Sequence, residues 1–163
     1  MKKLAMFFLI CLTVAVAPWI IHAQEKKQAE QKQTRLFNMI QNGKYGYIDS
    51  KGKIVVQPQF DEADEFSEGL APIRIGDKWG YIDPTSRIVI QPQYARAGEF
   101  SEGLAAVGVP DGKVGYMDRA QRIVIPPQFD KGWPFVNGLA RVKIGKKIGY
   151  IDKKGNYVWN PTQ

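Results

Sequence analysis

The sequence predicts an all-β fold of tandem repeats of about 34 residues, each with about three short strands, stacked as an open curved β-array. Three patterns recur in register and support this prediction. The segments KYGYID, KWGYID, KVGYMD and KIGYID begin at Lys44, Lys78, Lys113 and Lys147. QPQF, QPQY and PPQF keep the same step, and so do FSEGLA, FSEGLA and FVNGLA. Three coinciding patterns indicate structural repetition.

These patterns divide the repeat domain, residues 36–163, into three full units and one partial unit. The units are 36–69, 70–103, 104–138 and the shortened 139–163. A three-stranded unit of this size cannot bury enough apolar surface alone, whereas stacked units bury a continuous layer. A small closed ring, similar to a propeller, is the alternative. The last unit stops before its proline-aromatic corner, so a ring would need residues 24–43 for completion.

Each unit is expected to contain a hairpin and a returning strand. In the second unit, LAPIRI and KWGYID flank Gly76-Asp77, which is typical of a primed two-residue turn. An aspartate then opens the next turn, where its carboxylate can accept a backbone N–H from two residues on. Proline is predicted to close the third strand because it lacks the N–H that a ladder needs. The four aspartates are Asp49, Asp83, Asp118 and Asp152.

The N-terminal residues have the pattern of an export signal. Two lysines precede an apolar run and a small residue, which predicts a signal peptide over 1–23 with cleavage after Ala23. An uncleaved anchor is the alternative, because the apolar run from Leu4 to Ile21 is close to the minimum length that spans a bilayer. Residues 24–35 are predicted to form a polar linker. We therefore expect a secreted, periplasmic or surface location, or an N-terminally anchored protein.

Cleavage would remove Cys11 and His22, the only cysteine and the only histidine. The mature chain would then have no disulfide and would lack the commonest metal ligands and the commonest general base. We expect a protein that is not an enzyme and has no cofactor or metal.

The pattern GYID…G.IVI.P.F…F.EGLA.V resembles the WG repeat family over residues 36–163. The Trp-Gly pair of that family occurs here as Trp79-Gly80, whereas Tyr45, Val114 and Ile148 take the tryptophan position in the other units. The resemblance implies a bacterial β-repeat protein, of a kind that is frequently exported. It implies no particular activity.

Repeated carboxylates provide the one catalytic alternative, a cell-wall glycan hydrolase with two of them as acid and base. A residue present in every unit more often serves the unit itself, so we interpret the aspartates as turn residues. The acidic segment DEADEF at 61–66 could attract a divalent cation through its oxygens. It lacks the spacing of a calcium loop, which favours a solvated edge.

The charge of the chain is strongly asymmetric. Residues 24–112 hold 11 basic and 13 acidic residues, net −2, whereas residues 113–163 hold 10 and 3, net +7. A basic end suits a protein partner or an anionic cell-envelope polymer, and export argues against nucleic acid. Solubility and strand-edge protection are the alternative explanation. The candidate partner-binding residues are Arg141, Lys143, Lys146, Lys147, Lys153 and Lys154.

Trp133 is a further candidate because it departs from the repeat. It occupies the position of Asp64 and Gly98 in the earlier units. A tryptophan there either contacts a sugar ring or protein partner, or folds over the truncated last unit as a cap. Together these features predict an exported, non-enzymatic binding or scaffolding module that recognises a protein or cell-envelope polymer. Membrane contact is expected only if the N-terminal segment stays uncleaved.

Overall fold

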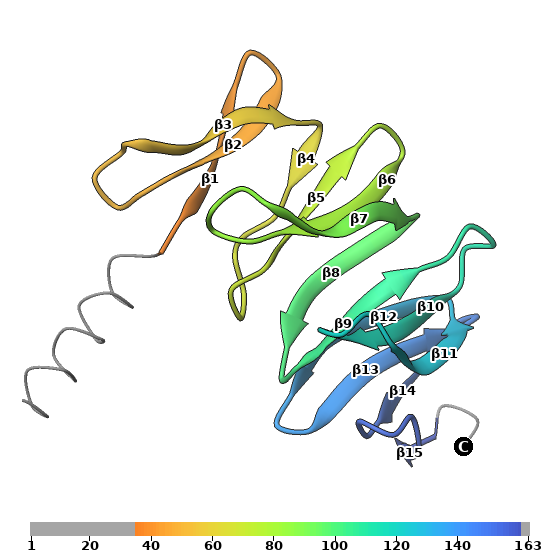
Figure 1. The fold of residues 1–163 in the computed structure, drawn as a ribbon. Helices are drawn as coiled ribbons and strands as arrows, with labels where there is room; N and C mark the ends of the chain where they lie inside the picture. Colours follow the sequence, from red (N-terminus) through yellow and green to blue (C-terminus); the bar gives the residue numbers. More distant parts are fainter. Residues whose placement is uncertain (1–34, 161–163) are drawn as a thin grey trace, which may run out of the picture. The chain divides into compact units, whose positions relative to one another are not determined.

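The computed structural model describes residues 35–160, which belong to one compact unit, Thr34–Gln163. Within these residues the fold is all-β, as predicted, with fifteen strands and no helix (Figure 1). No helix in this part of the chain could therefore cross a membrane. The expected signal peptide or anchor and nearly all of the polar linker lie outside the described residues.

The strands form four antiparallel sheets in residues 35–160, and each sheet is a meander in chain order. The first sheet has three strands: β1 (Phe37–Gln41), β2 (Lys44–Ile48) and β3 (Ile54–Phe60). The second has four: β4 (Glu62–Ala63), β5 (Ala71–Ile75), β6 (Lys78–Ile82) and β7 (Ile88–Tyr94). The third has β8 (Arg96–Ser101), β9 (Leu104–Gly108), β10 (Val114–Asp118) and β11 (Ile123–Phe129). The fourth has β12 (Lys131–Val136), β13 (Leu139–Ile144), β14 (Lys147–Ile151) and β15 (Tyr157–Trp159).

Three hydrophobic clusters of buried residues join consecutive sheets in residues 35–160. One lies between the first and second sheets, around Tyr47 and Ile73. The next lies between the second and third, around Tyr81 and Phe100. The last lies between the third and fourth, around Tyr116 and Phe135. Because each sheet packs against its sequence neighbour and the four sheets of residues 35–160 do not close into a ring, the predicted open array of tandem repeats is confirmed.

Three of the sheets contain one strand more than the repeat pattern suggested. The extra strands β4, β8 and β12 follow the proline-aromatic corner of one unit but pair with the first hairpin strand of the next. The chain passes from sheet to sheet at a single residue, whose N–H already bonds to the next sheet; these residues are Asp61, Ala95 and Asp130. Each of the three full units therefore contributes to two sheets, which links consecutive layers covalently and by ladder hydrogen bonds.

The prediction that proline closes the third strand is wrong, because β3, β7 and β11 continue two residues beyond it. The ladder accommodates proline by a bulge: Tyr81 pairs with Ile90, but Trp79 pairs with Tyr94, so the segment around Pro92 has no partner residue. A bulge leaves some N–H groups unpaired, so a residue without an N–H is tolerated there. The bulged backbone then presses against the glycine of the GYID motif.

The GYID tyrosines join consecutive sheets. Tyr47, Tyr81 and Tyr116 are fully buried, and burial raises the pKa of each phenol. Each hydroxyl donates to a backbone carbonyl 17 residues on, at 2.7–2.9 Å, in β8, in β12 or just after β4. Each ring also meets the phenylalanine of the next corner, with centroids 4.7–5.1 Å apart. Each of these three copies of the motif therefore fastens its sheet to the next.

The Ser-Glu-Gly corners make a second link between units. Ser67 and Ser101 donate to the carbonyls of Phe100 and Phe135, both at 2.6 Å. The carboxylate of Glu68 accepts the N–H of Gly103, at 3.1 Å from one of its oxygens, and that of Glu102 accepts the N–H of Gly138 at 3.0 Å. Each corner therefore holds the corner that follows.

The last corner has Val136 and Asn137 in place of serine and glutamate. The second residue of this corner has a φ of 51° in Glu68, 52° in Glu102 and 52° in Asn137. Asparagine tolerates this left-handed conformation far better than glutamate does. Where glutamate occupies this position, the hydrogen bond from its carboxylate to the following corner offsets the cost of the left-handed backbone conformation. No further corner follows Asn137 in the described residues, so the less strained asparagine is the favourable choice.

We expect Ser101→Ala to lower the free energy of unfolding by about 1–2 kcal/mol, since it leaves the Phe135 carbonyl without its donor. Val136→Ser is the matched control: it places a hydroxyl at the same repeat position, where no following corner accepts it, and should change stability by less than about 0.5 kcal/mol. Urea denaturation of both variants measures the difference. Equal effects would contradict the corner link.

Candidate functional site

The four repeated aspartates serve their own turns. Asp49, as an example, accepts the backbone N–H groups of Lys51 at 2.8 Å and Lys53 at 3.0 Å. At Asp83, hydrogen bonds from the Thr85 hydroxyl and from Arg87 lower the pKa to about 2. Asp118 and Asp152 bind in the same way within their turns. The turn interpretation is confirmed, and nothing in their geometry supports the hydrolase alternative.

The first two residues of the acidic segment 61–66, Asp61 and Glu62, form ion pairs. Asp61 accepts Lys44 Nζ at 2.5 Å and the N–H of Gly76 at 2.7 Å, and the Lys44 bond is the main reason for the lowered pKa of its carboxyl. Glu62 accepts a guanidinium N–H of Arg74 at 2.6 Å. Within residues 35–160 no three side chains of the metal-ligating types come together as a cation site.

The basic candidate residues of the last unit do not form one patch. Lys146 lies in the turn between β13 and β14, and Lys147 begins β14. Lys153 and Lys154 lie in the turn after β14, where Lys153 Nζ pairs with Glu102 at 3.0 Å. Lys143 on β13 stands opposite Lys131 on β12. The structure therefore distributes these cations over both ends of the fourth sheet.

Trp133 and Arg141 are the two predicted residues that the structure brings into contact. The guanidinium carbon of Arg141 lies 4.0 Å from the centroid of the Trp133 ring, a cation–π contact between neighbouring strands β12 and β13. Trp133 is half-buried, and its carbonyl accepts the hydroxyl of Tyr116. Its backbone is thus fixed to the third sheet, which holds the ring in a defined place.

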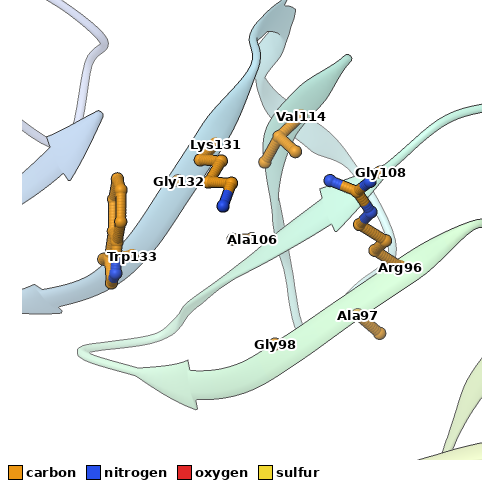
Figure 2. A pocket seen from close by; sticks show the side chains of 9 residues that line it. All are labelled: Arg96, Ala97, Gly98, Ala106, Gly108, Val114, Lys131, Gly132 and Trp133. Atoms are coloured by element: carbon orange, nitrogen blue, oxygen red, sulfur yellow. The ribbon is translucent and has the colours of Figure 1, made fainter. Parts of the chain in front are cut away.

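Two grooves share Trp133 as a wall. The first, which we call the Arg96 groove, has a volume of about 310 Å³ and includes Arg96, Ala106, Gly108, Val114, Lys131 and Trp133. Figure 2 shows Trp133 at one end of this groove and Arg96 at the other. The second, the Tyr150 groove, has a volume of about 600 Å³ and includes Glu99, Trp133, Pro134, Asn137, Arg141 and Tyr150. A rigid aromatic wall between two hollows is an arrangement that suits ligand contact.

Sequence reasoning found Trp133 and Arg141 but missed the rest of the two grooves. Arg96 and Lys131 lie on β8 and β12, the strands that the repeat pattern did not reveal. A usable signal was present: Gly108 interrupts the repeat just as Trp133 does, in place of the larger Arg74 and Lys143. Such a difference between units marks a residue that the fold of a single unit does not require.

Comparison with known proteins supports the repeat architecture. The family described as WG containing repeat matches at residues 45–79, 79–113 and 115–147, which together cover well over half of the sequence. A search of curated proteins found no match. The matched segments contain the first three copies of the GYID motif, the bulged prolines and the glycine corners described above. The chain therefore belongs to the WG containing repeat family.

Proposed function

We propose that the protein is an exported, non-enzymatic binding or scaffolding module that recognises a protein or cell-envelope polymer through its third and fourth sheets. Trp133 carries this proposal. Elsewhere at this position the repeat has the small or polar residues Gly98 and Asp64, so the ring is not required by the fold of a unit. It nevertheless lines both grooves and is held there by Tyr116 and Arg141.

Charge supports the same surface. Arg96, Lys131 and Arg141 line the two grooves, and Glu99 is the only acidic residue among the lining residues. Such a surface attracts an anionic or polar partner over a distance and orients it on the aromatic wall. The proposal that the protein is exported rests only on the signal-like sequence of residues 1–23.

The test is Trp133→Ala in the full-length chain, with binding measured by co-sedimentation with purified cell-envelope material and by capture of solubilised envelope proteins. Loss of a central aromatic contact should weaken binding about 30-fold, which corresponds to roughly 2 kcal/mol. The melting temperature should change by less than about 2 °C, because the ring is only half-buried.

Trp79→Val is the matched control, since the third unit carries Val114 at that position and Trp79 lies on β6, outside both grooves. This variant should bind as the unaltered protein does. Equal binding by all three proteins would refute the proposal. A fall of several degrees in the melting temperature of the Trp133 variant would instead identify the ring as a structural cap.

A further inference from the structure

One cross-strand position changes charge along the array. In the second sheet Glu62 stands opposite Arg74, and the two form an ion pair of 2.6 Å. In the third sheet the same position holds Arg96 opposite Gly108. In the fourth it holds Lys131 opposite Lys143. A balanced pair is therefore replaced first by a single cation and then by two facing cations.

Folding alone does not explain this replacement. Like charges directly opposite each other in a sheet are unfavourable, whereas the Glu62 arrangement shows that the fold accepts a neutral pair at this position. Neither Arg96 nor Lys131 has an ion-pair partner within residues 35–160. Asp130 is next to Lys131 in the chain, but its carboxylate accepts Lys113 Nζ at 2.7 Å and the N–H of Gly145. The two groove cations remain available to an anion.

The space between these cations arises from a second departure from the repeat. In the second sheet the paired residues Arg74 and Trp79 fill the corresponding position, whereas the third sheet has the paired residues Gly108 and Val114. A Cβ on Gly108 would lie 3.1 Å from the Cβ of Arg96, so the glycine lets the Arg96 side chain cross close to the strand. Smaller residues thus open the groove and position its cation.

The Arg96 groove therefore combines an aromatic wall, a floor of small residues such as Ala106 and Gly98, and cations at its rim (Figure 2). A pyranose ring stacks its C–H face on tryptophan, and a carboxylate on that ring suits the fork of an arginine. An acidic peptide side chain would use the cations but would leave the aromatic wall without a partner. The Tyr150 groove beyond Trp133 offers room for the neighbouring residue of a polymer.

We propose that the Arg96 groove binds one carboxylate-bearing sugar residue of an acidic glycan, with Trp133 under the ring and Arg96 and Lys131 at the carboxylate. This inference rests on the proposed binding function and names the chemistry of its ligand. No bond is made or broken in the complex.

The experiment titrates the full-length protein calorimetrically with a galacturonic acid oligomer, with a neutral glucose oligomer of equal length, and with oligoglutamate. The acidic sugar oligomer should bind about tenfold or more tightly than either control, since only it satisfies both the aromatic wall and the cations. Arg96→Glu introduces the negative charge that Glu62 has at this position of the second sheet, and it should reduce the affinity for the acidic sugar oligomer about tenfold or more. Val114→Trp fills the groove without changing charge and should do the same.

Lys51→Glu is the matched charge control, because Lys51 is exposed in the turn between β2 and β3 and lines neither groove. It should change the affinity less than about threefold. If Val114→Trp fails to fold, Arg96→Glu and Trp133→Ala still test the site.

The other outcomes separate this inference from the proposed function. Equal binding of the neutral oligomer would overturn the role of the cations but leave a glycan-binding module. Equal binding of oligoglutamate, unaffected by Trp133→Ala, would overturn the sugar and indicate an acidic peptide ligand. If none of the oligomers bound but envelope material were still captured in a Trp133-dependent way, only this inference would be overturned. If the capture of envelope material also did not depend on Trp133, the proposed function would be overturned too.

Discussion

Gly80→Ala should destabilise the protein by about 3–5 kcal/mol, among the largest effects expected of any single substitution. An added Cβ would overlap the carbonyl oxygen of Ile90 and would lie 2.7 Å from the nitrogen of Pro92. Both atoms belong to the bulged backbone of β7, so no side-chain rotation can relieve the clash. The same contacts recur at Gly46 and Gly115, which explains why the motif has glycine there too.

Thermal and urea unfolding measure this effect, with a decrease in melting temperature of about 10 °C or more expected. Gly98→Ala is the control, because its added Cβ would have its nearest contact at 3.5 Å, an ordinary van der Waals distance. Alanine is also less costly to order than glycine within a strand, so this variant should be neutral or slightly stabilising. If Gly80→Ala changed the stability as little as Gly98→Ala, the close approach at Gly80 would have to be relieved by movement of β7.

Tyr81→Ala is expected to have a comparable effect, about 3–5 kcal/mol, because its buried ring fills the space between the second and third sheets. Tyr81→Phe keeps the ring beside Phe100 and removes only the hydroxyl. That hydroxyl donates to the carbonyl of Gly98 at 2.7 Å. Losing this one hydrogen bond should cost only about 1–2 kcal/mol. The difference between the two variants separates packing from hydrogen bonding across the interface.

Tyr150→Ala is the matched control for Tyr81→Ala. Tyr150 is the GYID tyrosine of the last unit, yet it is 40% exposed because no fifth sheet covers it in the described residues. Its replacement should cost less than about 1.5 kcal/mol. Urea unfolding of the three variants provides the comparison, and a Tyr150 loss as large as the Tyr81 loss would refute the interpretation that the motif stabilises the array through the following sheet.

Much of the fold could be predicted because it is local. Turn aspartates, glycine corners and two-residue hairpins depend on hydrogen bonds among residues a few positions apart, and such patterns are visible in the order of residues. The strands β4, β8 and β12 were missed because their sequences, such as DEADEF and ARAGEF, lack the alternation of a half-buried strand. They form strands because each of them pairs with the free edge of the hairpin that follows it in the chain.

The grooves form between side chains that belong to different repeat units. Lys131 faces Lys143 because of the strand register in the fourth sheet, and Trp133 and Arg96 line one groove only because the third and fourth sheets pack together. Residues from successive repeats are brought together by the passage of the chain from one sheet to the next. Their proximity is therefore a property of packing between units.

The order of residues by itself determined a repeating all-β chain, with its turns, its glycine positions and its unusual tryptophan, because these follow from backbone conformation and side-chain periodicity within about 34 residues. The tertiary structure decided that each full unit supplies a strand to the next sheet, and that three cations and two aromatic rings border two adjoining grooves. Packing between sheets makes those decisions, since it sets which side chains of different units meet and how much space they leave.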